Sequence, residues 1–194
     1  MFIATMYSYG WDPECVGVDG IVTCMGVFLR YEKDLYALHA PFNGAKANER
    51  GKDDFVAYVK RETKGGAFIG GLKNAELIAV VNGNPRGDVT DEIKGYCKGL
   101  GTSSALVYQL SKNLGQSLNS QEAATIIWQQ VSKRNCSLKY RKHSDTTWQK
   151  NVGRVRQGWY GDNSSFTDNL TTDPDGPGWH VVDSTNSNIT EVRA

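Results

Sequence analysis

Short apolar segments separated by polar residues dominate the first part of the chain and predict β-strands. Two of them, 21–29 (IVTCMGVFL) and 35–40 (LYALHA), are joined by the polar residues RYEKD, a pattern typical of a β-hairpin. Another apolar segment begins the chain (FIATMYSY), and a turn-rich stretch around Gly17, Asp19 and Gly20 separates it from the hairpin. Later strands are expected at 75–81 (AELIAVV) and 178–183 (GWHVVD).

Longer segments, in the middle of the chain, have apolar spacings and end residues that predict helices. These segments are 53–64, 90–100, 103–115, which has three leucines four residues apart, and about 120–134. Strands early and late with helices between them predict an α/β (α+β) fold built as one domain over residues 1–194.

Composition excludes several classes of protein. Of the 194 residues, 39% are hydrophobic and 10% aromatic, too many for an intrinsically disordered chain. No apolar segment is long enough for a transmembrane helix, and the first residues lack the basic start and apolar centre of a signal peptide. The net charge of +1 argues against a protein that coats nucleic acid.

Charge is unevenly distributed, and the polar C-terminal part from about residue 135 is the most segregated. Residues 133–156 carry eight basic and one acidic side chain, whereas residues 157–194 carry one basic and six acidic ones. This pattern fits an electrostatic docking surface, and it equally fits two segments that neutralise each other in the fold. Because Tyr140 and Trp148 lie in the basic segment, a non-catalytic RNA-binding or protein-docking module is one alternative function.

The four cysteines are the candidate reactive groups. Cys15, Cys24, Cys97 and Cys136 form no CxxC or zinc-ligand pair, so we expect no metal ion, no cofactor and a reducing compartment. Cys24 is the most informative, because it lies near the start of an apolar strand while His39 lies on the next strand.

The separation of Cys24 and His39 puts both side chains on one face of the sheet when the hairpin loop has an even number of residues. A two-residue turn at Tyr31-Glu32 would place Arg30 against Lys33, which is unfavourable. The preferred register has a four-residue turn from Tyr31 to Asp34. It pairs His39 with Gly26, leaves Cys24 as the diagonal neighbour of the histidine, and gives the ring room beside the glycine.

A cysteine beside a histidine is a nucleophile beside its base. A free thiol is mostly protonated at neutral pH. An imidazole that takes its proton produces a thiolate–imidazolium pair, which attacks a carbonyl or carboxamide carbon.

The hairpin VTCMGVFLRYEKDLYALHAPFN resembles the cysteine–histidine hairpin of the CheD-type and cytotoxic-necrotizing-factor-type glutamine deamidases, and of the stand-alone lethal-factor deamidases related to them. The resemblance covers about 25 residues, with Thr23-Cys24 and His39-Ala40-Pro41 in corresponding places. It implies a central mixed β-sheet or β-sandwich with flanking helices. It also implies hydrolysis of a glutamine side chain of a target protein to glutamate through a thioester, with Cys24 as nucleophile and His39 as base and then acid.

The resemblance leaves the third catalytic group open. Several members have a threonine six residues before the cysteine to orient the histidine, and this chain has Val18 there. Asp19, Thr23 or a main-chain carbonyl could replace it, and Asp19 or a carbonyl is preferred because Thr23 would face away from Cys24 on a regular strand. Transglutamination uses the same two residues and stays an alternative reaction.

Stand-alone proteins of this kind are often toxins or effectors, so the resemblance implies virulence-type action on a host target. We expect a monomer that acts in the cytosol of a target cell after secretion without a classical signal peptide, or else a cytoplasmic protein. No membrane or nucleic-acid partner is expected.

A second thiol site remains open. His180 followed by Asp183 is similar to the histidine strand of papain-like and transglutaminase-like enzymes, with Cys24 or Cys97 as the nucleophile. His143 lies in a basic polar stretch and is expected to be solvated.

Overall fold

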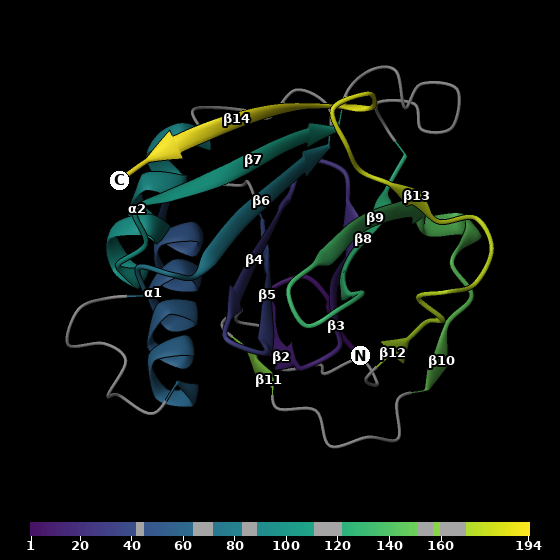
Figure 1. Ribbon diagram of the computed structural model, residues 1–194, viewed down its shortest axis with the longest axis horizontal. Helices are drawn as coiled ribbons and strands as arrows, with labels where there is room; N and C mark the ends of the chain where they lie inside the picture. Colours follow the sequence, from purple (N-terminus) through teal and green to yellow (C-terminus); the bar gives the residue numbers. More distant parts are fainter. Residues whose placement is uncertain (42–44, 64–71, 83–88, 111–121, 151–156, 160–169) are drawn as a thin grey trace.

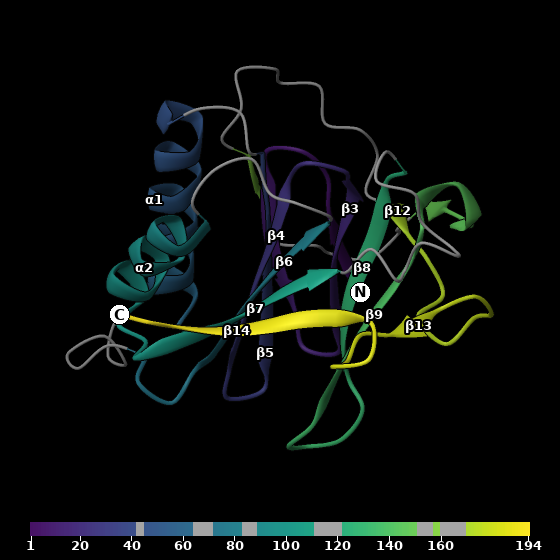
Figure 2. The same cartoon turned by 90° about the horizontal axis from the view of Figure 1, so that it is seen from above.

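The computed structural model describes residues 1–41, 45–63, 72–82, 89–110, 122–150, 157–159 and 170–194. Two β-sheets and two helices form three layers (Figures 1 and 2). The five-stranded sheet consists, in spatial order, of β1 (Phe2–Ala4), β3 (Cys15–Ile21), β8 (Ala124–Gln130), β9 (Cys136–Lys142) and β13 (His180–Val181). The seven-stranded sheet consists, in spatial order, of β11 (Gln157–Trp159), β2 (Ser8–Asp12), β5 (Asp34–Ala40), β4 (Met25–Tyr31), β6 (Glu76–Asn82), β7 (Ser104–Leu110) and β14 (Ser187–Arg193).

The remaining elements flank these sheets. Helices α1 (Ala45–Glu62) and α2 (Val89–Leu100) cover the face of the seven-stranded sheet that points away from the five-stranded sheet (Figure 1). A short 3-10 helix, η3 (His143–Asp145), follows β9, and β10 (Gln149–Lys150) pairs with β12 (Leu170–Thr171). This arrangement confirms the predicted α+β class, with mixed sheets and flanking helices.

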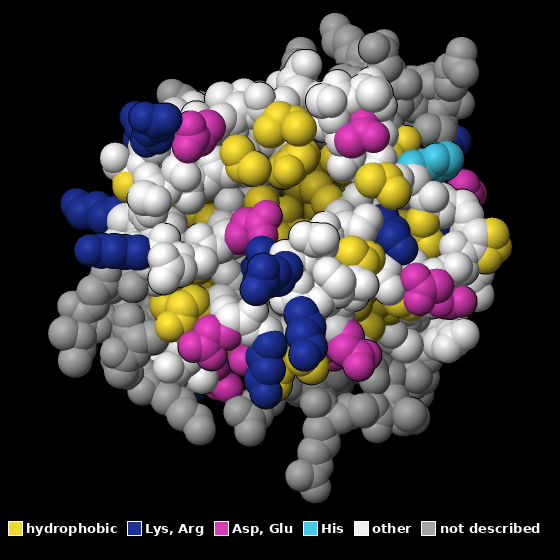
Figure 3. All heavy atoms as spheres, viewed as in Figure 1, with side chains coloured by type: hydrophobic (Ala, Val, Ile, Leu, Met, Phe, Trp, Pro, Cys, Tyr) yellow, Lys and Arg dark blue, Asp and Glu magenta, His cyan; other side chains and the backbone are white. Residues whose placement is uncertain are grey.

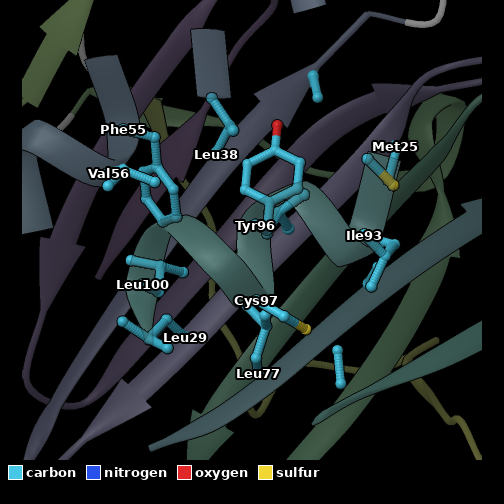
Figure 4. Packing of buried hydrophobic residues seen from close by; sticks show 14 of the residues in the cluster. Met25, Leu29, Leu38, Phe55, Val56, Leu77, Ile93, Tyr96, Cys97 and Leu100 are labelled. Atoms are coloured by element: carbon cyan, nitrogen blue, oxygen red, sulfur yellow. The ribbon is translucent and has the colours of Figure 1, made fainter. Parts of the chain in front are cut away.

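Strand alternation divides the core into two apolar layers. Along β4, Met25, Val27 and Leu29 pack toward the helices, whereas Phe28 packs toward the five-stranded sheet. Apolar residues of α2 recur at intervals of three or four positions and so form one buried stripe. Figure 4 shows this stripe against residues of the sheet and of α1, with the rings of Tyr96 and Phe55 6.5 Å apart in an edge contact.

Two of the predicted helices are wrong. Residues 104–110 form β7 and residues 124–130 form β8; residues 111–121 lie outside the described part of the chain. Both strands are interior strands and carry apolar residues on both faces, so each sequence contains a short apolar run without strict alternation, ALVY in β7 and IIW in β8. A short apolar run of this kind cannot be separated from a buried helix by periodicity.

The turn predicted around Gly17 and Gly20 is also wrong, because residues 15–21 form β3. Gly17 is required by close packing: a Cβ atom there would lie 2.5 Å from the Ile3 side chain. Gly20 has a φ of +74° and lies where the pairing of β3 with β8 shifts register, as in a β-bulge.

The other predicted elements are confirmed with changed ends. The hairpin and the strand at 76–82 are present, the second helix begins at Val89, and the first helix begins earlier than expected, at Ala45. The strand predicted over 178–183 is reduced to two residues. Within the described part of the chain, no helix has the length and hydrophobicity needed to cross a bilayer.

Candidate active site

The β4–β5 hairpin has the register preferred from the sequence. Gly26 is paired with His39 near the open end. The predicted four-residue turn is shorter than expected, because Tyr31 and Asp34 are paired strand residues and the turn consists of Glu32 and Lys33. Cys24 immediately precedes β4, two positions before Gly26. An extension of the ladder therefore makes Cys24 the diagonal neighbour of His39 on the same face.

This face of the hairpin is directed into the space between the two sheets. Phe28 and Ala37, which alternate with the helix-facing residues, belong to the apolar layer that the sheets share. His39 follows the same alternation and is only 1% exposed, while Cys24 is 7% exposed. The candidate pair thus lies at the end of the sandwich, largely screened from solvent.

Burial determines the charge of His39. Removal from water disfavours the imidazolium and lowers the pKa of His39 from 6.5 to about 4, although a hydrogen bond with the backbone of Ala4 acts in the opposite direction. The imidazole is therefore neutral at physiological pH. This corrects the expectation of a thiolate–imidazolium pair in the resting protein, and it leaves a neutral base beside a thiol.

The backbone of Ala4 favours the charged form of His39 and is therefore a candidate for the main-chain orienting group that the sequence left open. A bond that favours the charged imidazole requires an acceptor, which on the main chain is a carbonyl oxygen. Ala4 lies in β1 of the five-stranded sheet, whereas His39 lies in the other sheet, so the contact depends on how the sheets pack. A main-chain carbonyl was among the groups expected from the sequence, but no sequence pattern indicates which carbonyl it is.

Asp19 forms hydrogen bonds with residues other than His39. Its carboxylate accepts a hydrogen bond from the Thr125 hydroxyl at 2.8 Å, and its Oδ1 lies 2.7 Å from Nδ1 of His143. Thr125 alternates with Ile126 of the inter-sheet core, so this group lies on the outer face of the five-stranded sheet. The proposed role of Asp19 as the orienting group of His39 is thereby withdrawn, and Thr23 is exposed.

The space expected beside Gly26 is already filled. A Cβ atom at this position would lie 2.9 Å from the Phe28 ring and 3.1 Å from the Ile21 side chain. Gly26 therefore permits close packing around the hairpin and leaves no open volume beside the imidazole.

The Asp19–His143 pair is a feature that sequence reasoning missed. His143 was expected to be solvated; its side chain is 45% exposed and that of Asp19 is 15% exposed. The Thr146 hydroxyl donates to Thr125 at 3.2 Å and so extends the chain of hydrogen bonds. These residues are far apart in the sequence and carry no common motif, so only the pairing of β3, β8 and β9 brings them together.

The alternative thiol site is not assembled around Cys97. Cys97 is fully buried between α2 and the seven-stranded sheet, whereas His180 lies on β13 of the other sheet and stacks on Tyr140 at 5.1 Å. The Asp183 carboxylate accepts hydrogen bonds from the backbone N–H and the hydroxyl of Thr185, and these bonds lower its pKa.

The basic segment contacts the acidic segment that follows it. Lys139 Nζ lies 3.6 Å from the Asp175 carboxylate and donates to the Pro174 carbonyl. Arg141 is buried, donates to Thr172 and to the Pro177 carbonyl, and covers the ring of Trp179. On the face seen in Figure 3, basic and acidic side chains are interspersed. Of these contacts, the one between Lys139 and Asp175 neutralises charge between the two segments, whereas those of Arg141 are with neutral groups.

A pocket of about 590 Å³ lies at the other end of the sandwich. Its lining includes Cys15, the first residue of β3, and Lys33 of the hairpin turn, both distant along their strands from the Cys24 end. Burial raises the pKa of the Cys15 thiol well above its usual range, so this cysteine stays protonated. Within the described residues, no three His, Cys, Asp or Glu side chains are arranged to hold a metal ion.

No protein-family model matches the chain, and no curated protein matches it. The function is therefore inferred from the geometry and chemistry of the chain's own residues.

Proposed function

We propose that the protein is a cysteine hydrolase that converts a glutamine side chain of a target protein to glutamate. The observation that carries the proposal is the hairpin register, in which Gly26 is opposite His39 and Cys24 is two positions away on the same face. The two-sheet architecture with flanking helices also agrees with what the hairpin resemblance implies.

In the first half of the proposed reaction, Cys24 Sγ attacks the amide carbon of the glutamine side chain while neutral His39 accepts the thiol proton. The tetrahedral intermediate collapses, the carbon–nitrogen bond breaks, and His39 returns the proton to the leaving ammonia. A thioester between Cys24 and the substrate remains.

In the second half, His39 accepts a proton from water as the water oxygen attacks the thioester carbon. The carbon–sulfur bond breaks and the proton returns to Cys24. The net change is glutamine plus water to glutamate plus ammonia, with no cofactor. The hydrogen bond with the Ala4 backbone would hold the ring in one orientation through both halves.

The low pKa of His39 has a consequence for this mechanism. The neutral imidazole is in the correct state to accept a proton, but it is a weak base toward a thiol of ordinary pKa. We therefore propose that the thiol reacts slowly with general reagents and that its proton is transferred during attack on a bound substrate.

We further propose that the target is a cytosolic protein of another cell, reached after delivery of this protein as a toxin or effector. Mass spectrometry of proteins from cells exposed to wild type, Cys24→Ala or Cys15→Ala tests the function. Cys15→Ala is the matched control, because it removes another buried thiol at the opposite end of the sandwich.

The expected result is an amide-to-acid mass change at one glutamine with wild type and Cys15→Ala, and no change with Cys24→Ala. Incorporation of an added amine at the same glutamine would assign transglutamination to the site. Identical proteins from all three samples contradict the proposal.

A further inference from the structure

We propose that Asn82 is a positioning residue that holds Cys24 in place at the crossing between the two sheets. Asn82 is the last residue of β6 and is 9% exposed. Its side-chain nitrogen donates to the Ile21 carbonyl at 3.1 Å and to the Glu122 carbonyl at 3.0 Å. The meaning of this position for catalysis rests on the proposed function.

The two carbonyl groups belong to the opposite sheet. Ile21 is the last residue of β3, and Glu122 lies just before β8. Asn82 belongs to the seven-stranded sheet, so its amide joins the two sheets at their Cys24 end. Residues 22–24 are the link by which the chain leaves one sheet and enters the other at Met25.

The strand register places Asn82 beside this link. Val81 is paired with Met25 in the β4–β6 ladder, so the next position along β6 lies across from Cys24. One end of the link is fixed by the β4 ladder, and the other is fixed at Ile21 by the pairing with Ala124 in the β3–β8 ladder and by the Asn82 amide. Cys24, between these two fixed points, keeps its place on the His39 side of the hairpin.

The contact requires a side chain that donates hydrogen bonds, and the Asn82 amide is such a side chain. Both partners are carbonyl acceptors, and an amide nitrogen has two N–H groups to give them. An aspartate of nearly the same shape would place a carboxylate against two carbonyl oxygens. Alanine would leave both carbonyls without this donor in a buried setting, which is unfavourable.

Loss of the amide is therefore expected to loosen residues 22–24 locally and to expose the Cys24 thiol more often. Cys97 is an internal reference that distinguishes local from global opening. Cys97 is fully buried under α2 in the other apolar layer, so it becomes accessible only when the core opens. Local opening changes one thiol, whereas a global loss of stability changes both.

The experiment measures alkylation rates of Cys24 and Cys97 in the same molecules by peptide mass spectrometry, without denaturant. It compares wild type with Asn82→Asp and Asn82→Ala. Ser187→Ala is the matched control: Ser187 is also buried and donates to a main-chain carbonyl, that of Asp183, at the separate crossing between β13 and β14.

Each Asn82 variant is expected to raise the Cys24 to Cys97 rate ratio at least about tenfold, and Ser187→Ala is expected to leave it unchanged. The inference would be overturned if both alkylation rates rose in parallel or if both Asn82 variants failed to fold, because Asn82 would then stabilise the whole fold. An unchanged ratio would also overturn it, because Asn82 would then have no effect on Cys24. The alkylation ratio is measured without a substrate. The inference about Asn82 can therefore be confirmed when the glutamine assay is negative, and it can fail when the glutamine assay is positive.

Discussion

His39 and His143 lie at the same end of the two sheets but in opposite environments. His39 is buried between the sheets, and desolvation lowers its pKa to about 4. His143 is on the outer face, close to half exposed, with the Asp19 carboxylate 2.7 Å from Nδ1. Judged by contacts alone, His143 together with Asp19 resembles an oriented acid–base pair more closely than His39 does.

An orienting carboxylate does not by itself identify a catalytic histidine. His39 faces the side of the hairpin on which Cys24 is placed by the strand register. Asp19 and His143 join β3 to the segment after β9 on the far side of the five-stranded sheet. We therefore propose a chemical role for the buried histidine and a structural one for the exposed pair.

The largest expected difference between the two histidines is their effect on stability in acid. Because the pKa of His39 is 6.5 when unfolded and about 4 when folded, the unfolded chain binds the additional proton between these values. Stability is then fully present above pH 6.5 and is lost as pH falls toward 4, by about 3 kcal/mol. Urea unfolding of wild type, His39→Gln and His143→Gln between pH 4 and 7 measures it.

The loss of stability at low pH should be present in wild type and His143→Gln and absent in His39→Gln. Asp34 and Glu92, whose pKa values are raised by burial, act in the opposite direction but remain in all three proteins, so the difference isolates His39. Equal acid profiles for wild type and His39→Gln would show that His39 is accessible to solvent.

A second expected difference concerns the glycines beside each histidine site. Gly26→Ala should destabilise the protein by about 1–3 kcal/mol, since the new methyl group would meet Phe28 and Ile21 in the core. Gly20→Ala, next to Asp19, meets no atom within 4 Å and should cost roughly 1 kcal/mol, because its φ of +74° disfavours a side chain. Thermal unfolding ranks the two; a smaller loss for Gly26→Ala would contradict the packing around His39.

The smallest expected effect is at the exposed pair. Asp19→Asn should reduce stability by at most about 1 kcal/mol, because the hydrogen-bonded contact with His143 is partly solvated. Chemical denaturation of wild type and Asp19→Asn provides the measurement. A loss as large as the acid effect of His39 would give the pair a greater structural role than its exposure suggests.

The sequence predicted the features that depend on neighbouring residues. The charges of Arg30 and Lys33 and the parity of the loop were enough for the hairpin register. The strands at 104–110 and 124–130 were missed because burial on both faces removes the alternation that distinguishes a strand.

The unpredicted parts of the site depend on sheet packing. Ala4 contacts His39 from the other sheet, and Asn82 reaches Ile21 and Glu122 across the interface. No local pattern marks an alanine carbonyl or a strand-end asparagine for these roles. The prediction that Asp19 orients His39 is wrong, because the histidine that its carboxylate contacts is His143, which lies 124 residues later in the chain.

Deamidation of the target protein by matched histidine variants tests whether His39 is the base of the proposed reaction. Wild type, His39→Ala and His143→Ala are compared by the rate at which the target glutamine becomes glutamate. His39→Ala is expected to lose about 10²- to 10⁴-fold in rate, as for removal of a general base, and His143→Ala to keep a rate close to wild type. Retained activity in His39→Ala, with loss in His143→Ala, would contradict this expectation and assign the chemistry to the exposed pair.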